Sequence, residues 1–203
     1  MLLNLTVIAI GYILGSIPTA YLIARLRKGI DIRNVGVGNV GAANVFWQIG
    51  YWDGVIVWII DMAKGAAPIF IAQALSVAQP WVLGAGFAAL LGHNFPVFLK
   101  FKGGKGSSTA IGIFLALAPV EMSIALVIIA IPLFITHHFA FSLAIGFIFL
   151  PLLIWLFQDS MMLVFYSLAL IFFIGLRSLP HSGKFWTEIT KKHDKSPGHD
   201  NSN

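Results

Sequence analysis

The sequence contains no cysteine, so the chain can form no disulfide and can offer no thiolate to a metal ion or to catalysis. It is also poor in charge, because Asp, Glu, Lys and Arg make up 10% of the 203 residues, against about a quarter in an ordinary soluble domain. The alternation of polar and apolar residues that a membrane β-barrel requires is missing as well. These absences exclude thiol chemistry and argue against both a soluble domain and a barrel.

Long apolar runs dominate what is present, and hydrophobic residues make up 58% of the chain. The sequence therefore predicts an all-α integral membrane protein with about seven transmembrane helices, cytoplasmic glycine-rich loops and one multi-pass domain over residues 1–203. The expected segment 107–118 is short for a full span, so five or six spans would also fit. The seven apolar segments are 3–24, 53–74, 81–98, 107–118, 120–136, 140–157 and 160–176.

The formal charge of +5 would suggest a nucleic-acid partner in a soluble protein, but here the basic residues cluster in the loops between apolar segments, so we expect no nucleic acid. With the N-terminus outside, the connections on the outer side carry Glu121 and Asp159 and no basic residue. The positive-inside rule then predicts a cytoplasmic C-terminus. We expect the first span to be retained, and the polar tail 178–203 to be loosely ordered. Twelve of the 13 Lys and Arg fall on the cytoplasmic side, all except Lys64: Arg25, Arg27, Lys28, Arg33, Lys100, Lys102, Lys105, Arg177, Lys184, Lys191, Lys192 and Lys195.

The first expected cytoplasmic loop contains "GVGNVGAAN", in which Gly36, Gly38 and Gly41 match the pattern G-x-G-x-x-G. The pattern follows a membrane helix and not a buried strand, so we do not expect a dinucleotide site. Glycine amides can nevertheless approach an anion closely, and "GAANVF" can open a helix whose N-terminus favours negative charge. The loop is interpreted as an anion site that includes Gly38 and Gly41, with a tight re-entrant turn as the alternative.

The second expected cytoplasmic loop, "FPVFLKFKGGKGSST", places Gly103, Gly104 and Gly106 around Lys105. It is not a Walker A loop, since Leu99 and Gly106 occupy positions where that pattern needs glycine and a hydroxyl residue. Backbone amides, one ammonium group and three hydroxyl residues at a helix start nevertheless suit a phosphate. An anchor that obeys the positive-inside rule is the alternative, but it would not require three glycines.

Two charges, Asp61 and Lys64, lie three residues apart inside an expected span, on one face of its helix. Charges at such depth are costly, so we expect either a structural ion pair or a pair that faces a cavity. Gly11, Gly15 and Thr19 are spaced by four and predict a close-packing face on the first helix. The six histidines show no spacing that suits a metal site, so we expect no metal and no cofactor.

Three stretches, "GSIPTAYLIARLRKGIDIRNVGVGNVGAANV", "IDMAKGAAP" and "LGHNFPVFLKFKGGKGSST", resemble the bacterial membrane-integral acyl-phosphate:glycerol-3-phosphate acyltransferases. The resemblance covers residues 8–110, and the later spans match by length and hydropathy. It implies a seven-helix monomer of the bacterial inner membrane that moves a fatty acyl group from acyl phosphate to glycerol 3-phosphate and gives lysophosphatidic acid. It also implies that Gly103, Gly104, Lys105 and Gly106 bind phosphate with Gly38 and Asn39, and that Lys105, Asn39 and Ser142 are catalytic.

The sequence departs from that family at positions that carry polar ligands. Val37, Ala43 and Trp47 stand where the family's first motif usually has serine, threonine and arginine, and a closing R-H-x-x-N-I-x-R-L motif is replaced by "LRSLPHSGKFWTEITKKH". Arg177 stands near the start of that motif, and His181 or Glu188 could substitute within it. Two alternatives therefore stay open: a catalytically silent relative that binds acyl phosphate or membrane lipid, and a small transporter built around Asp61 and Lys64.

Overall fold

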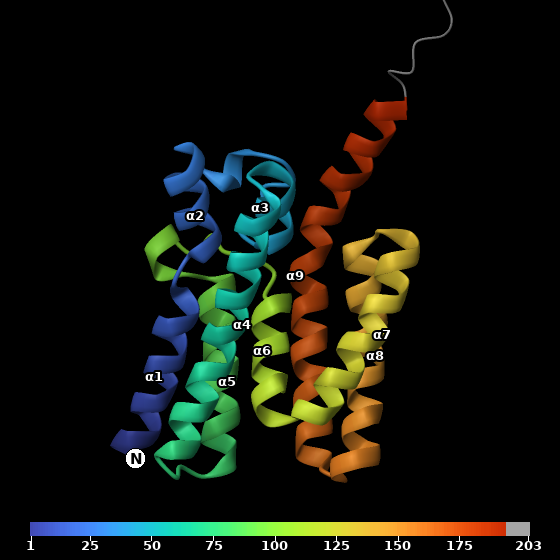
Figure 1. The fold of residues 1–203 in the computed structure, drawn as a ribbon. Coiled ribbons are helices and arrows are strands. Elements are labelled where there is room, and N and C mark those ends of the chain that lie inside the picture. Colours follow the sequence, from blue (N-terminus) through green and yellow to red (C-terminus); the bar gives the residue numbers. More distant parts are fainter. Residues whose placement is uncertain (194–203) are drawn as a thin grey trace, which may run out of the picture.

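The computed structural model describes the backbone of residues 1–193 and the side chains of residues 1–179. Throughout that part every regular element is a helix, which confirms the predicted all-α class (Figure 1). The α-helices are α1 Leu2–Ser16, α2 Thr19–Lys28, α3 Ala42–Gln48, α4 Tyr51–Ala74, α5 Gln79–Asn94, α6 Ser107–Leu117, α7 Pro119–Thr136, α8 Phe139–Gln158 and α9 Met161–His193, and two short 3₁₀ turns are η1 Ile32–Asn34 and η2 Val97–Leu99.

Six runs within the described residues are long and apolar enough to cross a membrane: α1 with α2, α4, α5 with η2, α7, α8 and the first part of α9. The remaining apolar helix, α6, has 11 residues. At 1.5 Å per residue it is about 16 Å long, against about 30 Å for the hydrocarbon core. The predicted integral membrane fold is confirmed, with the expected short segment appearing as a half-length helix.

Two of the expected segments differ in the structure. The first, 3–24, is broken between α1 and α2, because Pro18 has no N–H to continue the helix and Ile17 before it takes an extended conformation (φ −58°, ψ 115°). The last continues beyond residue 176, since α9 runs to His193 and includes the beginning of the segment for which we expected loose order. The final ten residues, 194–203, lie outside the described residues.

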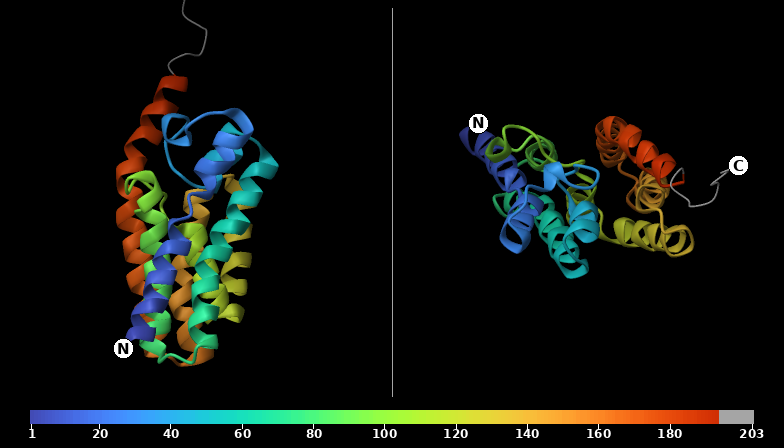
Figure 2. Two further views of the ribbon diagram at one scale, coloured as in Figure 1. Left: turned by 90° about the vertical axis from the view of Figure 1, so that its left-hand side faces the viewer. Right: turned by 90° about the horizontal axis from the view of Figure 1, so that it is seen from above.

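The helices form two packed groups that α6 joins. α1 and α4 pack on α5, α8 packs on both α7 and α9, and α6 packs mainly on α4 with further contacts to α7 and α5 (Figure 2). Gly11 and Gly15 of α1 lie against the backbone carbonyls of Ala85 and Ala89 of α5, so a larger side chain at either glycine would collide with α5. The predicted close-packing face of the first helix is therefore confirmed for these two glycines.

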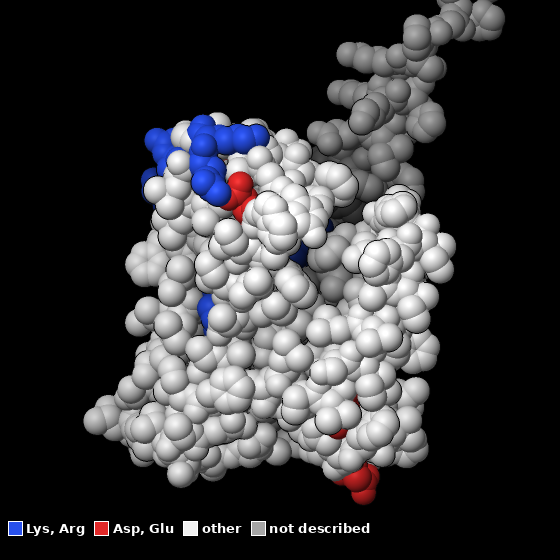
Figure 3. All heavy atoms as spheres, viewed as in Figure 1, with Lys and Arg blue, Asp and Glu red and all other residues white. Residues whose placement is uncertain are grey.

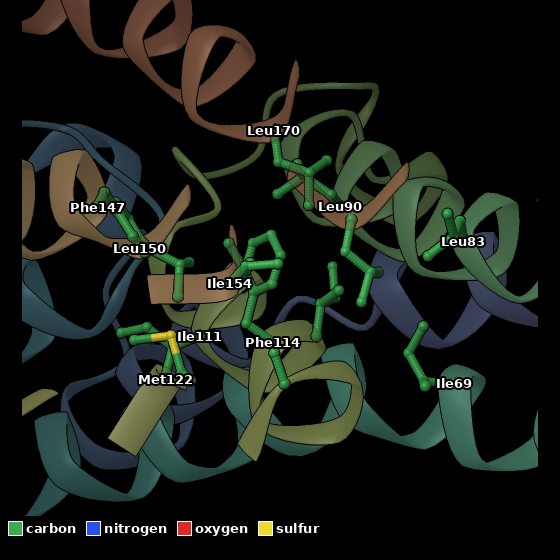
Figure 4. Close-up of a cluster of buried hydrophobic side chains, with 14 of the residues drawn as sticks. Ile69, Leu83, Leu90, Ile111, Phe114, Met122, Phe147, Leu150, Ile154 and Leu170 are labelled. Atoms are coloured by element: carbon green, nitrogen blue, oxygen red, sulfur yellow. The ribbon is translucent and has the colours of Figure 1, made fainter. Parts of the chain in front are cut away.

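The core lies around the short helix α6. Phe114 of α6 is fully buried, and it is surrounded by apolar side chains from α5, α7, α8 and α9 (Figure 4). Lipid is as apolar as these side chains, so dispersion and tight fit, and not removal from water, hold the helices together within the bilayer. This packing fixes α6 inside the bundle, and its N-terminus lies where the second glycine loop ends. The labelled members of the cluster are Ile69, Leu83, Leu90, Ile111, Phe114, Met122, Phe147, Leu150, Ile154 and Leu170.

Candidate active site

Both predicted glycine loops lie at the same end of the bundle, the end at which α2 carries Arg25, Arg27 and Lys28 (Figure 3). Between the loops is a cleft of about 260 Å³. One cation in its wall comes from α9, far along the chain. The lining residues are Arg33, Gly38 and Val40 from the first loop, Phe101, Lys102 and Gly103 from the second, and Arg177 from α9.

Asn44 organises the first loop from a buried position at the start of α3. Its side-chain amide donates to the carbonyls of Ile32 at 3.2 Å, Val35 at 3.1 Å and Asn39 at 3.0 Å. Gly38, which lines the cleft, has a φ of +69°, a conformation that costs other residues free energy. Gly41 precedes α3, which begins at Ala42 as "GAANVF" predicted. The loop is thus a fixed turn that brings Gly38 to the cleft.

The end of α5 holds the second loop. The amides of Gly103 and Gly104 donate to the carbonyls of Asn94 at 3.2 Å and His93 at 3.1 Å. A side chain at Gly103 would collide with the carbonyl of His93, and one at Gly104 with the ring of His93 and the carbonyl of Val40, so close packing accounts for both glycines. This differs from our expectation that the two amides would be exposed to a ligand. The phosphate-binding roles of Gly103 and Gly104 remain predictions, and the donors free for an anion lie further along the loop.

Those donors are at the start of α6, which begins at Ser107 as predicted. The amides of Ser107, Ser108 and Thr109 have no acceptor within the helix, and the helix dipole places partial positive charge at this end. Gly106 precedes them with a φ of +92°, and a side chain there would collide with Leu90 and Asn94. The turn into α6 therefore requires a glycine and presents a helix start toward the end of the bundle at which both glycine loops lie.

Lys105 lies directly before this turn and is half-buried. Burial lowers the pKa of its ammonium group below the ordinary value of 10.5. No hydrogen bond or ion pair engages its Nζ within the part of the chain that the structure describes. A partly desolvated cation without a counter-ion would be stabilised by an anion beside it, which supports a phosphate at this position.

The other cations of the cleft differ in how far they are already neutralised. Arg33 pairs with Asp31 at 2.6 Å, and this hydrogen-bonded pair lowers the pKa of the Asp31 carboxyl. Arg177 lies with its guanidinium carbon 4.7 Å from the centre of the Phe95 ring, and its Nη2 donates to the carbonyls of Asn94 at 3.3 Å and Gly104 at 3.4 Å. A backbone carbonyl carries no net charge, so these contacts do not neutralise the guanidinium of Arg177. Arg177 and Lys102 therefore give the cleft a positive charge.

Two predicted catalytic residues have less support from the geometry. Asn39 lies in the first loop, where its backbone carbonyl accepts from Asn44 and its buried Oδ1 has no partner among the described residues. Ser142 is buried in α8, its hydroxyl donates to the carbonyl of His138 at 2.9 Å, and it does not line the cleft. Nothing tests either role, and both stay predictions.

The positions that depart from the family motif do not line the cleft either. Trp47 is 73% exposed on α3, where its ring packs edge-on against Phe46 with 5.0 Å between ring centres. Val37 is partly buried in the first loop. The side chains of His181 and Glu188, which could substitute within the closing motif, lie outside the described side chains.

Sequence reasoning underrated several residues that build the site. Arg33 and Arg177 were read mainly through the positive-inside rule, although both line the cleft. Asn44, His93 and Asn94 are polar residues near the motif glycines, and their burial and hydrogen bonds show that they shape the loops. A polar residue between small and apolar neighbours at a loop end was the available signal for Asn44 and Asn94.

A polytopic helical membrane protein with a cationic cleft walled by two glycine loops belongs to the class of membrane proteins that handle anions at the bilayer surface. Comparison with known proteins makes this specific. The family model described as glycerol-3-phosphate acyltransferase matches residues 5–183, so the chain belongs to the glycerol-3-phosphate acyltransferase family. The resemblance seen in the motifs is confirmed, and the family is one of acyltransferases.

Similar proteins and solved structures support the same family. The chain is 41% identical over 174 residues to glycerol-3-phosphate acyltransferase 1 of Dehalococcoides mccartyi, which covers 83% of this chain and 84% of that protein. It is 47% identical over 122 residues to the enzyme of Geobacter sulfurreducens, over 60% and 62% of the two chains. Crystal structures of PlsY (YgiH), an integral membrane glycerol 3-phosphate acyltransferase, superpose with TM-scores of 0.83 for the glycerol 3-phosphate form and 0.80 for the lysophosphatidic acid form. The first is 31% identical and covers 91% of this chain and 92% of its own. These findings disfavour the transporter alternative.

Proposed function

We propose that this protein transfers a fatty acyl group from acyl phosphate to glycerol 3-phosphate, giving lysophosphatidic acid, and acts as a monomer without a cofactor. The observation that carries the proposal is the cationic cleft that the two glycine loops and Arg177 form, with Lys105 two residues beyond Gly103 in the second loop. Both substrates bring a phosphate, and PlsY has been solved with glycerol 3-phosphate and with lysophosphatidic acid.

The reaction requires little more of the protein than orientation and positive charge. Acyl phosphate is a mixed anhydride, so its carbonyl carbon is already activated toward a hydroxyl. An alkyl hydroxyl of glycerol 3-phosphate attacks that carbon, the new ester bond forms, the bond from carbonyl carbon to phosphate oxygen breaks, and inorganic phosphate leaves with the hydroxyl proton. Lys105 and the free amides at the start of α6 would stabilise the charge that develops on the departing phosphate.

The wall of the cleft also offers an apolar surface for the acyl chain of the substrate. Phe101 is 58% exposed and lines the cleft beside the charged residues, so the cleft combines cations with an apolar wall. An acyl chain would pass from this wall into the bilayer while the phosphate stays with Lys105.

The proposal places the cleft on the cytoplasmic side of the bacterial inner membrane, with the N-terminus outside. The basic end of the bundle supports this orientation. Because the chain has no cysteine, a single cysteine placed at Leu3 or at Asn34 reports its side without background. In intact cells an impermeant maleimide should label the cysteine at position 3 and leave the one at position 34 unlabelled, and the opposite pattern would overturn the orientation.

The activity is tested with purified protein, labelled glycerol 3-phosphate, and either palmitoyl phosphate or palmitoyl-coenzyme A. We expect labelled lysophosphatidic acid with palmitoyl phosphate and none with the thioester, because the cleft offers phosphate contacts for the leaving group. Product from the thioester alone, or from neither donor, would overturn the proposed reaction.

A second candidate function, a silent relative that binds acyl phosphate without transferring the acyl group, is favoured by Val37 and Trp47. A valine side chain offers no hydrogen bond and a tryptophan carries no charge, so two polar contacts that family members have would be missing. Binding of palmitoyl phosphate to the protein in detergent, measured by calorimetry and accompanied by no product, would favour this candidate.

A further inference from the structure

A cluster of three buried polar residues lies deeper in the bundle than the cleft and takes no part in the proposed reaction. Asp61 and Lys64 come from α4 and His93 from α5, with exposed fractions of 1%, 6% and 6%. Lys64 Nζ lies 2.8 Å from Asp61 Oδ1, and His93 Nδ1 lies 3.9 Å from Asp61 Oδ2. The sequence left open whether Asp61 and Lys64 form an ion pair, and the structure shows that they do.

Lys64 also reaches the break in the first span. Its Nζ donates to the carbonyl of Ile17 at 3.0 Å, at the point where Pro18 interrupts the helix between α1 and α2. A carbonyl at such a break lacks the intrahelical donor that a continuous helix would supply. The carbonyl of Ile17 accepts from the amide of Thr19 at 3.0 Å as well, and the bond from Lys64 ties α4 to the point where the chain turns toward the first glycine loop.

His93 reaches the second glycine loop in two ways. Its backbone carbonyl accepts from the amide of Gly104 at 3.1 Å, and its ring Nε2 lies against Gly104, where a side chain would collide with it. The carbonyl of Val40, from the first loop, packs on Gly104 as well. Gly104 is therefore held between the imidazole of His93 and the backbone of the first loop.

No substrate can reach the cluster itself. The cavity that Asp61, Lys64 and His93 line with Val40 and Pro96 has a volume of about 10 Å³, which is room for no more than one water molecule. Val40 also lines the 260 Å³ cleft, so Val40 lies between the cluster and the cleft, and its carbonyl packs on Gly104.

We propose that Asp61, Lys64 and His93 are positioning residues, which hold the two glycine loops in register so that Lys105 and the start of α6 face one phosphate. The inference rests on the proposed function for the identity of that phosphate. Stability alone is a weak explanation of a buried ion pair, because well-packed apolar residues often replace such pairs without loss. Contact with both loops gives this one a geometric role.

The test compares Lys64→Met, Asp61→Asn and the double variant with the wild type. Lys64→Met keeps the length of the side chain and removes the donor to Ile17. Glu121→Gln is the matched control, because Glu121 is also a buried carboxylate, at 2% exposure, but lies at the start of α7, away from the cleft residues. The readouts are thermal unfolding, KM and kcat with palmitoyl phosphate, and hydrogen exchange of the segment 95–106.

For the variants of the cluster we expect KM to rise at least tenfold and exchange of the amides of Gly103 and Gly104 to accelerate, with segments of α7 and α8 unchanged. Glu121→Gln should leave KM and exchange of 95–106 unchanged. Variants that only lower the unfolding temperature, with KM and local exchange as in the wild type, would overturn the positioning role.

Two further features keep the test decisive. If Lys64→Met does not fold, His93→Asn serves instead, since it keeps a polar group near Asp61 and removes the ring edge that lies against Gly104; unchanged KM and exchange in that variant would contradict the proposal. Hydrogen exchange needs no turnover, so an inactive wild type would defeat the proposed reaction, while local exchange would still decide whether the cluster positions the loop.

Discussion

The side-chain amide of Asn94 donates to the backbone carbonyl of Lys105 at 3.2 Å. Asn94 is fully buried and ends α5, and its own carbonyl accepts from the amide of Gly103 and from Arg177. One uncharged residue thus connects the end of a membrane helix, the glycine turn, the lysine and the cation that α9 supplies. The geometry of the cleft therefore depends on this connection.

Replacing Asn94 by aspartate should test that dependence with almost no change of shape. The variant loses the donor to Lys105 and places an acceptor opposite a carbonyl, which we expect to cost about 1–3 kcal/mol of stability and to lower kcat/KM at least tenfold. Thermal unfolding and steady-state kinetics measure both effects.

Gln158→Glu is the control for this change, because Gln158 is exposed at the end of α8 and donates to the carbonyl of Leu117 at 3.4 Å. The same chemical substitution there should leave kcat/KM within a factor of two. Equal losses in the two variants would show that Asn94 has no special role.

A second prediction concerns the turn into α6. Gly106→Ala forces a left-handed conformation on alanine, at about 1–2 kcal/mol, and drives its side chain into Leu90 and Asn94. We expect a lower unfolding temperature and loss of most activity. Gly175→Ala in α9 is the matched control, since nothing lies within 4 Å of the new methyl group and alanine favours a helix. A Gly106→Ala enzyme as active as the Gly175→Ala enzyme would contradict the described turn.

The third prediction is a pH dependence set by Lys105. Burial lowers its pKa below 10.5, so the ammonium form that binds phosphate is lost as pH rises through that lowered pKa. Activity should therefore be full below this pKa and fall on the alkaline side. Lys105→Arg should keep part of the activity and move the alkaline fall to higher pH, because arginine stays charged throughout the accessible range. A profile of kcat/KM against pH that is identical in the two enzymes would assign the fall to another group.

The sequence predicted the helices well but did not predict where the first of them breaks. The apolar runs predicted the helices, and the seven segments correspond to α1 with α2, α4, α5, α6, α7, α8 and α9 within a few residues, except that α9 continues to His193. The break at Pro18 was not predicted, because the hydropathy of an apolar run does not reveal the loss of one backbone hydrogen bond.

The glycine loops were recognised as a pair from composition, but the reason for each glycine was not. Composition suggested amides exposed to a ligand, whereas Gly103 and Gly104 are needed because α5 lies too close for any side chain. Such close approach depends on long-range packing, which no local pattern encodes. For the same reason Arg177 could not be assigned to the cleft, since only the packing of α9 against the rest of the bundle brings it there.

The fourth prediction concerns the positions at which this chain departs from its family. Trp47 is exposed and Val37 only partly buried, so Val37→Ser with Trp47→Arg should leave stability within about 0.5 kcal/mol. If the polar residues usual in the family bind phosphate, each restored contact contributes about 1.5–3 kcal/mol, and KM for glycerol 3-phosphate should fall at least tenfold. An unchanged KM would mean that this cleft binds its acceptor without these two positions.

The central claim, that Lys105 holds the phosphate during acyl transfer, is tested most directly by replacing the ammonium and keeping the length of the side chain. The quantity to measure is kcat/KM with palmitoyl phosphate and glycerol 3-phosphate for wild type and Lys105→Met, with equal unfolding temperatures as the check on folding. We predict a loss of at least a hundredfold in Lys105→Met. A folded Lys105→Met enzyme that turns over at the rate of the wild type would contradict the account.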